Sequence, residues 1–236
     1  MPDSPRSFTD IVRSRRSVRG FLPDPVPAAD IRAVLEDAQR APSNCNTQPW
    51  QVHVVSGAHR DALSAALLQA DRDGRFSSDF SFDYADFGDG LYLQRAQKQG
   101  AAYYQSLGVE RSDTQGRHAA ALRNLEFFGA PHVALLFLPQ FGDGVRVAGD
   151  MGMYAQTFLL ALEARGLAGI PQTMLGSYAD VVRGSLDIKS DMKLLFGISF
   201  GLADPQGPAS AYRMGRAPLA ESVVLHGTPG VLDGAH

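Results

Sequence analysis

The sequence predicts a single α+β domain, in which helices surround a mixed sheet of four to five strands. The strands are predicted by apolar runs such as APHVALLFLP, which have the length of buried strands. Segments with helical periodicity lie between these runs. No repeat, low-complexity linker or shift in composition divides the 236 residues, so we expect one domain over residues 1–236.

Helices are expected where apolar residues recur every three to four positions. In VPAADIRAVLEDAQRA, Pro27 suits the first helical turn, and Ile31 and Val34 begin one apolar stripe. The expected helices are about 7–16, 27–41, 59–70, 91–107, 112–128, 147–165 and 178–185. The expected strands are 50–56, 130–139, 170–175 and 193–203.

Two stretches fit neither pattern. Residues 71–90 place aromatic side chains between acids and Asp-Gly pairs, and long irregular segments of this kind are usually lids or binding loops. We therefore consider residues 76–90 as a substrate lid, or alternatively as a loop anchored on the core. The aromatic residues of this segment are Phe76, Phe80, Phe82, Tyr84 and Phe87. The proline-rich tail over 203–236 cannot form a compact element alone.

Composition narrows the class of protein. A net charge of −3 and a pI near 6.0 argue against general binding to nucleic acid or to a membrane surface. Cys45 is the only cysteine, which excludes an intramolecular disulfide and fits a reducing cytosol. The sequence shows neither a signal-peptide core nor a membrane-spanning run, so a cytoplasmic protein is expected.

Positive charge gathers at two places. The segment IVRSRRSVRGF holds Arg13, Arg15, Arg16 and Arg19, and a second group, Arg213 and Arg216, lies in YRMGRAPL. On charge alone, the first group is a solvated helix end. The alternative is a phosphate site, because guanidinium groups offer paired donors to phosphate oxygens.

A polar connector joins the second expected helix to the first expected strand. Its sequence, RAPSNCNTQPW, contains two prolines and side chains that compete for backbone hydrogen bonds, so neither helix nor strand is expected there. Ser43, Asn44, Asn46 and Gln48 offer both donors and acceptors. Such a set suits a heterocyclic or polyol ligand.

Other chemistries are less well supported by the sequence. GISFG matches the GxSxG pattern of serine hydrolases with Ser199 as nucleophile, but a nucleophile elbow needs a following helix, and LADPQGP forbids one. GDGVRV lacks the third glycine of a dinucleotide-binding loop. Cys45 is expected to be a small buried residue in a tight turn. His53 and His132 are expected to be core or edge residues of strands, and no metal site is expected.

Five segments together resemble the FMN-dependent nitroreductase family, in its nitrobenzoate-reductase-like branch. They are RRSVRGF, APSNCNTQPWQVHVVSG, RNLEFFGAPH, DMGMYAQTFLLALEARGLAGIPQT and YRMGRAPL, and the resemblance runs from about Ser7 to Val224. It implies a nitroreductase-like fold and an intertwined homodimer with two FMN sites at the subunit interface. It also implies that the tail over 203–236 reaches across the partner subunit.

The resemblance assigns positions around the flavin. Arg15, Arg16 and Ser17 would hold the FMN phosphate and ribityl chain, Arg19 would lie near the N1–C2=O edge, and Arg213 and Arg216 would close the phosphate site. Pro42, Ser43, Asn44 and Asn46 would come from the other subunit. Asn124 would lie at the ring edge, and Pro171, Gln172 and Thr173 near N5. Better-known members carry Glu and Gly where this chain has Thr173 and Met174.

The implied activity is hydride transfer from NAD(P)H through flavin N5 to a nitroaromatic or similar electron-poor acceptor, with ping-pong kinetics and no catalytic side chain. FMN would be tightly bound, and NAD(P)H would be a transient donor. Alternatives within the family are a flavin-dependent dehydrogenase, an ene-reductase and a flavin-degrading enzyme. A flavin-storage module and a serine hydrolase using Ser199 are the alternatives from other classes.

Overall fold

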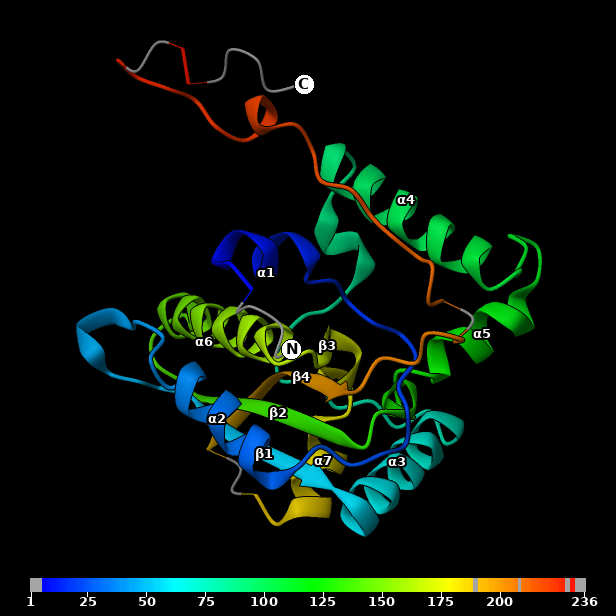
Figure 1. The fold of residues 1–236 in the computed structure, drawn as a ribbon. Helices are drawn as coiled ribbons and strands as arrows, with labels where there is room; N and C mark the ends of the chain where they lie inside the picture. The colour runs from blue at the N-terminus through cyan, green and yellow to red at the C-terminus, as the bar shows by residue number, and fades with distance from the viewer. Residues whose placement is uncertain (1–5, 189–190, 208, 228–229, 232–236) are drawn as a thin grey trace, which may run out of the picture.

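A four-stranded sheet forms the centre of the molecule (Figure 1). The computed structural model describes residues 6–188, 191–207, 209–227 and 230–231. The strands run in the order β1 (Gln51–Ser56), β2 (His132–Pro139), β4 (Met192–Gly201) and β3 (Ala168–Gln172). All neighbouring strands pair antiparallel. The predicted α+β class and strand number are confirmed, but in the described residues parallel pairing is limited to isolated bridges such as Ser17–Gly169.

Helices cover both faces of this sheet. The helices of the described residues are α1 (Phe8–Ser14), α2 (Ala28–Ala38), α3 (Gly57–Arg72), α4 (Leu91–Ser106), α5 (Thr114–Leu122), α6 (Val145–Ala164) and α7 (Ala179–Leu186). Those that pack on the faces of the sheet include α3 and α7 on one side and α2 and α6 on the other. Strand β2 is buried along nearly its whole length. Its alternate side chains enter two cores: Val133 and Leu135 pack with residues of α3 and α7, whereas Ala134 and Leu136 pack with residues of α2 and α6.

The segment after α5 departs from the predicted helix over 112–128. Helix α5 ends at Leu122, and the chain then bends through Phe127 and Phe128, whose φ angles are +55° and +54°. Left-handed backbone at two consecutive residues cannot continue a right-handed helix. Both phenyl rings are buried, so the bend turns two large apolar side chains into the core.

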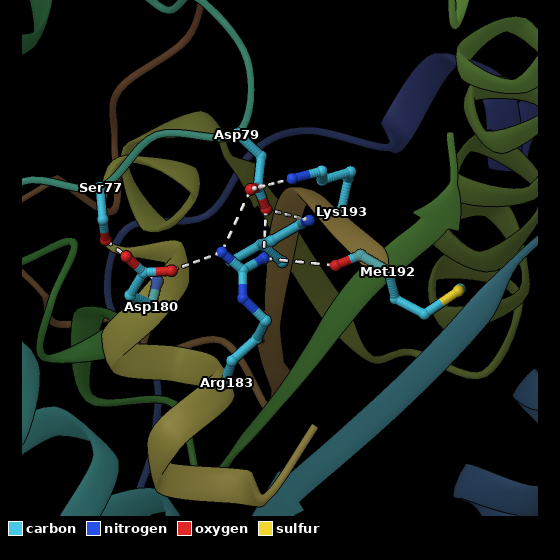
Figure 2. A network of polar contacts seen from close by, with 7 residues as sticks. Ser77, Asp79, Asp180, Arg183, Met192 and Lys193 are labelled. Carbon is cyan, nitrogen blue, oxygen red and sulfur yellow. Dashed lines mark hydrogen bonds and ion pairs between the residues drawn. The ribbon is translucent and has the colours of Figure 1, made fainter. Parts of the chain in front are cut away.

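The first half of the 71–90 segment is tied to the core by a buried carboxylate (Figure 2). Asp79 accepts from Arg183 Nη1 at 2.5 Å and from the Leu194 N–H at 2.8 Å, and Lys193 Nζ lies 3.3 Å away. Although burial alone would raise it, the pKa of Asp79 is held below its usual value by these hydrogen bonds. Phe82 adds an apolar anchor, since its ring lies directly against Gly176.

Helix α4 and the C-terminal tail extend together away from the sheet (Figure 1). Arg95 of α4 pairs with Glu221 of the tail at 2.6 Å, and Gln99 bonds to the hydroxyl of Tyr212 at 2.9 Å. Much of the tail beyond Arg216 is exposed, including Leu219 and Val224. None of the helices in the described residues has the length and apolar character needed to cross a membrane.

Candidate functional site

The two arginine groups meet in space, although nearly 200 residues separate them in the sequence. Arg15 and Arg16 follow the last turn of α1, which is fixed to the end of α6 where Ser14 donates to Glu163 Oε1 at 2.7 Å. Burial lowers the pKa of Arg15, and the charge of Arg216 lowers it further. Burial and Arg213 act on Arg16 in the same way.

This arginine cluster (Arg15, Arg16, Arg213 and Arg216) has the properties of an anion site. In the described ranges, none of the four guanidinium groups forms an ion pair with a carboxylate. Glu163 offsets part of the charge on Arg15 and Arg16, but it is bonded to Arg6 at 2.9 Å. Four neighbouring cations repel one another, and a dianionic phosphate would convert that repulsion into attraction. The donor set therefore fits the phosphate of FMN.

Arg19 lies apart from this cluster and is held between aromatic rings. Its Cζ lies 4.8 Å from the ring centroid of Tyr103 in α4 and 5.3 Å from that of Tyr212 in the tail. Burial lowers the pKa of Arg19. Ser17, two residues earlier, is fixed by its backbone bridge to Gly169 at the start of β3. The residues from Ser17 to Arg19 thus lead from the sheet edge toward α4.

Arg19 and Asn124 border the same cavity, of about 1310 Å³, whose other walls come mainly from α4 and α5. Asn124 is held at its edge because the buried amide of Gln172 donates to Asn124 O at 2.9 Å. Gln172 in turn accepts a short hydrogen bond from the Ser199 hydroxyl. The cavity therefore offers guanidinium and amide groups, Arg19 and Asn124 among them, which suit a heterocycle with carbonyl oxygens.

The position of Ser199 rules out the serine hydrolase hypothesis. Ser199 lies within β4, is fully buried, and uses its hydroxyl to bond Gln172. Asp204 and His226, two of the imagined partners, lie outside this strand, and Asp233 and His236 fall outside the described residues. A nucleophile must be exposed at a turn between strand and helix. GISFG is a core strand in which glycines accommodate close packing.

The segment expected near flavin N5 is partly available to a ligand. Pro171 and Thr173 are exposed, whereas the side chain of Gln172 between them points into the core. Pro171 belongs to β3, which is an edge strand of the sheet, and Thr173 begins a single 3₁₀ turn. A ligand at this edge would meet Pro171, Thr173 and the main chain rather than the Gln172 amide.

The polar connector is a strained and exposed turn. Cys45, Asn46 and Gln48 have φ angles of +51°, +56° and +47°, which non-glycine residues rarely adopt. The turn is held by the Ser43 hydroxyl, which accepts from the Gln48 N–H at 2.9 Å, and by the Asn44 N–H, which donates to Asp150 Oδ1 at 2.9 Å. Cys45 does lie in a tight turn, but the expectation that it is buried was wrong.

The connector and the arginine cluster lie at opposite ends of α6. The connector is bonded to Asp150 near the start of this helix, and the cluster adjoins Glu163 at its end. With a rise of 1.5 Å per residue, these two positions are about 20 Å apart. The connector residues Pro42, Ser43, Asn44 and Asn46 are therefore not brought to the arginine cluster within one chain.

Two site residues carried no signal in the sequence. Tyr103 and Tyr212 flank Arg19, yet nothing in their sequence context distinguishes them from ordinary core tyrosines. The nearest signal is that Tyr212 directly precedes Arg213 in YRMGRAPL. Asp150, which accepts a hydrogen bond from the connector, was not predicted either, because it lies within a mostly apolar helix.

The histidines behave as expected for residues of strands. His132 is buried and its Nε2 accepts from the Val26 N–H at 2.9 Å, while its Nδ1 lies 2.6 Å from the Ser56 hydroxyl. His53 packs edge-on against Phe137, although its buried Nε2 has no hydrogen-bond partner in the part of the chain that the structure describes. The described part of the chain contains no cluster of His, Cys, Asp and Glu that would hold a metal ion.

Comparison with known proteins identifies the family of this chain. Residues 12–202 match the model of the nitroreductase family. The chain is 46% identical to nitroreductase NfnB of Mycolicibacterium smegmatis, covering 90% of this chain and 89% of the relative, and 34% identical to 4-nitrobenzoate reductase of Pseudomonas putida, covering 89% and 91%. The crystal structure of FMN-dependent NfnB from Mycobacterium smegmatis with NADPH superimposes with a TM-score of 0.88 at 44% identity, covering 92% and 96%. The chain belongs to the nitroreductase family.

Proposed function

We propose that this protein is an FMN-dependent oxidoreductase that passes hydride from NAD(P)H to a nitroaromatic or similarly electron-poor acceptor. The observation that carries the proposal is the convergence of four arginines that form no ion pair within the described residues. The tail connects them to the cavity bordered by Arg19 and Asn124, because Tyr212, which contacts Arg19, directly precedes Arg213. The relatives named as nitroreductase and 4-nitrobenzoate reductase support the same activity. The substrate is then a small aromatic molecule.

The arginine cluster would bind the phosphate of FMN. Arg15 and Arg16 directly follow α1, and Arg213 and Arg216 come from the tail, so the phosphate would fix the tail against the end of α1. Each hydrogen bond to a charged group contributes about 1.5–3 kcal/mol, and several of them explain tight retention of the cofactor. The hydroxyl of Ser17 adds a donor for the ribityl chain.

When bound, FMN supplies the hydride chemistry, for which no side chain of the protein is needed. Arg19 would place a fixed positive charge at the N1–C2=O edge, where negative charge builds during two-electron reduction. Asn124 would donate or accept at the opposite polar edge, in the orientation that Gln172 fixes. NAD(P)H and the acceptor would use one slot in turn, which predicts ping-pong kinetics.

We further propose that the active protein is a homodimer. In a two-fold dimer with α6 packed antiparallel on its copy, the connector of one chain would lie beside the arginine cluster of the other. The exposed face of α6 suits such packing, because Gly149, Gly152 and Met153 lie on it and no atom lies near the glycines. Pro42, Ser43, Asn44 and Asn46 would then complete the flavin site in trans.

The remaining parts of the proposal concern the tail and the compartment. The exposed apolar residues of the tail, Leu219 and Val224, would pack on the partner subunit, as an arm of the single domain over 1–236. Residues 76–90 would border the acceptor slot, with their first half fixed by Asp79. An exposed free thiol at Cys45 and the use of NAD(P)H fit the cytosol.

The decisive experiment follows the colour and turnover of the purified protein. We expect a bound-flavin absorbance spectrum, bleaching by NADPH or NADH under anaerobic conditions, and reoxidation by 4-nitrobenzoate. Parallel line patterns in steady-state kinetics would agree with one slot used in turn. A colourless protein that fails to take up added FMN would overturn the proposal.

The same experiment separates the alternatives. Reoxidation by an activated alkene but not by a nitroaromatic would indicate an ene-reductase. Reoxidation by oxygen with loss of the flavin itself would indicate flavin degradation. Bound FMN that NAD(P)H does not reduce would indicate a storage module.

A further inference from the structure

Arg19 is a half-buried cation whose contacts in the described structure are aromatic rather than anionic. Its guanidinium carbon lies 4.8 Å from the ring centroid of Tyr103 and 5.3 Å from that of Tyr212. The two rings contact each other edge-to-face, with centroids 5.9 Å apart and an interplanar angle of 65°. Arg19 forms no ion pair within the described ranges, so these rings are what hold its charge in place.

The two tyrosines come from different parts of the chain. Tyr103 is a buried residue of α4, and Tyr212 belongs to the tail, just before Arg213 of the arginine cluster. The Tyr212 hydroxyl accepts from Gln99 Nε2 at 2.9 Å and donates to Gln99 O at 3.2 Å. One side chain of the tail is thereby fixed on α4, and the neighbouring guanidinium of Arg213 is fixed by the Tyr212 carbonyl at 2.9 Å.

We propose that Tyr103 and Tyr212 form an aromatic clamp that positions Arg19 against the flavin ring and thereby sets the ease of flavin reduction. The inference rests on the proposed function, because it needs FMN beside Arg19. Both tyrosines are positioning residues, since they act through the guanidinium and not on the reacting atoms. A cation at the ring edge favours the reduced flavin, which carries more negative charge, over the oxidised flavin.

The hydroxyl of Tyr212 contributes to the clamp, whereas that of Tyr103 does not. The buried Tyr103 hydroxyl has no hydrogen-bond partner among the described residues, so only its ring contributes, and Tyr103→Phe should preserve the clamp. The Tyr212 hydroxyl forms both bonds to Gln99, so Tyr212→Phe should loosen it, and Tyr212→Leu should open it. A cation held on aromatic faces loses its restraint when a ring becomes an aliphatic side chain.

The test compares midpoint potentials of the FMN-loaded protein and its variants. For Tyr103→Leu, Tyr212→Leu and Arg19→Gln, we expect a potential more negative by roughly 30 mV. This equals a tenfold loss of preference for reduced over oxidised flavin in a two-electron couple. Tyr103→Phe should keep the wild-type potential. Tyr92→Leu is the matched control, because Tyr92 lies on the same helix but is 69% exposed.

The outcomes distinguish the clamp from the proposed function. A wild-type protein that binds no FMN contradicts the proposed function itself. If FMN binds and Arg19→Gln shifts the potential while both leucine variants do not, the clamp is wrong. If Arg19→Gln leaves the potential unchanged in flavin-loaded protein, Arg19 does not act on the ring and the clamp is again wrong. Should either leucine variant fail to fold, Tyr212→Phe serves, with a smaller negative shift expected and an unchanged potential counting against the clamp.

Discussion

Arg16 is expected to lower the stability of the protein when no anion is bound and to raise its affinity for an anion such as the FMN phosphate. Its pKa is lowered by burial and by the charge of Arg213, so the folded chain works against its positive charge. A bound phosphate would attract the guanidinium groups of both Arg16 and Arg213, and this attraction would offset their mutual repulsion. Affinity and stability should therefore respond in opposite directions when Arg16 is removed.

We accordingly predict that Arg16→Ala weakens FMN binding by roughly ten- to a hundredfold, from the loss of a charge-assisted hydrogen bond. The thermal midpoint of the apoprotein should stay the same or rise, because one repulsion is relieved. Fluorescence titration of apoprotein with FMN, with thermal unfolding in parallel, measures both. Arg13→Ala is the matched control, since Arg13 is an exposed arginine of the last turn of α1, three residues before Arg16. Equal losses in the two variants would mean that the effect is one of general charge.

His132 links the stability of the sheet to pH. Its Nε2 accepts from the Val26 N–H, so the neutral ring must carry its proton on Nδ1, toward the Ser56 hydroxyl. Protonation of His132 at Nε2 would remove this acceptor and place the new Nε2–H opposite the Val26 N–H, so the hydrogen bond would be lost. Burial lowers the pKa of His132, and the same holds for His53.

A lowered histidine pKa means that the unfolded chain binds the proton more readily than the folded one. Stability should thus be full above the unfolded pKa of about 6.5 and should fall as the pH drops below it, until the folded pKa is passed. We predict that the free energy of unfolding decreases between pH 7 and pH 5. Replacing both residues (His132→Gln with His53→Gln) should flatten that slope, measured by urea unfolding at several pH values. An unchanged slope would contradict the role of these rings.

Some properties of single residues could be predicted from the sequence, and others could not. The sequence predicts that Ser199 is no nucleophile, because the residues after GISFG cannot form the helix that a nucleophile elbow needs. This prediction depends only on local sequence. Cys45 was expected to be buried and is exposed, since burial depends on what packs against a turn rather than on the turn itself. Tyr103 and Tyr212 were missed because their meeting with Arg19 requires α4 and the tail to fold together.

At the scale of elements, the segment over 71–90 depends on one buried ion pair (Figure 2). The side chain of Asp79 is 5% exposed and that of Arg183 is 11% exposed. Breaking a buried ion pair typically costs 3–5 kcal/mol. The loss of Asp79 should cost an amount at the lower end of this range, because Arg183 keeps its second ion pair, with Asp180 at 2.6 Å. The Asp79–Arg183 contact therefore fixes the first half of this segment to the core, and the later residues of the segment lie beyond this contact.

We predict that Asp79→Asn lowers the free energy of unfolding by about 3 kcal/mol, as measured by chemical denaturation at neutral pH. Because the pKa of Asp79 is lowered, its contribution is present at neutral pH and is lost only as the pH falls below about 4. Asp89→Asn, an exposed change in the same segment, should leave stability within about 0.5 kcal/mol. Similar losses in both variants would show that Asp79 is no special anchor.

The elements themselves were largely predictable, because the strands carry apolar runs or alternation and most helices a periodic pattern. The strand expected over 170–175 instead runs over Ala168–Gln172, and a 3₁₀ helix follows it. A second exception is the end of α5, where the sequence around Phe127 and Phe128 has helical composition, but both rings are drawn into the core. Strand direction was not predictable in the same way. Pairing depends on how segments far apart in the chain meet, and the sequence contains no turn signal that fixes it.

At the scale of the whole molecule, α6 separates two halves of the proposed site. Its start holds the connector through Asp150 and its end holds α1 through Glu163, so a single chain presents the halves about 20 Å apart. A second copy related by a two-fold axis would bring unlike halves together. Cofactor binding and dimerisation should therefore be lost together when the exposed face of α6 is blocked.

Gly152 tests this coupling. It lies on the exposed face of α6, and a Cβ added there would meet no atom within 4 Å, so Gly152→Arg fits the isolated chain. Replacing a helical glycine by arginine should raise the intrinsic helix stability by up to about 1 kcal/mol. In a dimer packed through α6, however, the new side chain would hold the two helices apart. We predict that Gly152→Arg is folded, monomeric and at least tenfold weaker in FMN binding.

Light scattering coupled to sizing chromatography gives the mass of the variant, and fluorescence titration gives its affinity for FMN. Gly184→Arg is the matched control, since Gly184 is an exposed helical glycine of α7 with equally open surroundings. It should remain dimeric and keep its flavin, because α7 lies on the other face of the sheet from α6. A Gly152→Arg protein that is still dimeric and fully loaded would place the subunit interface elsewhere, and the connector would then have no route to the arginine cluster through α6.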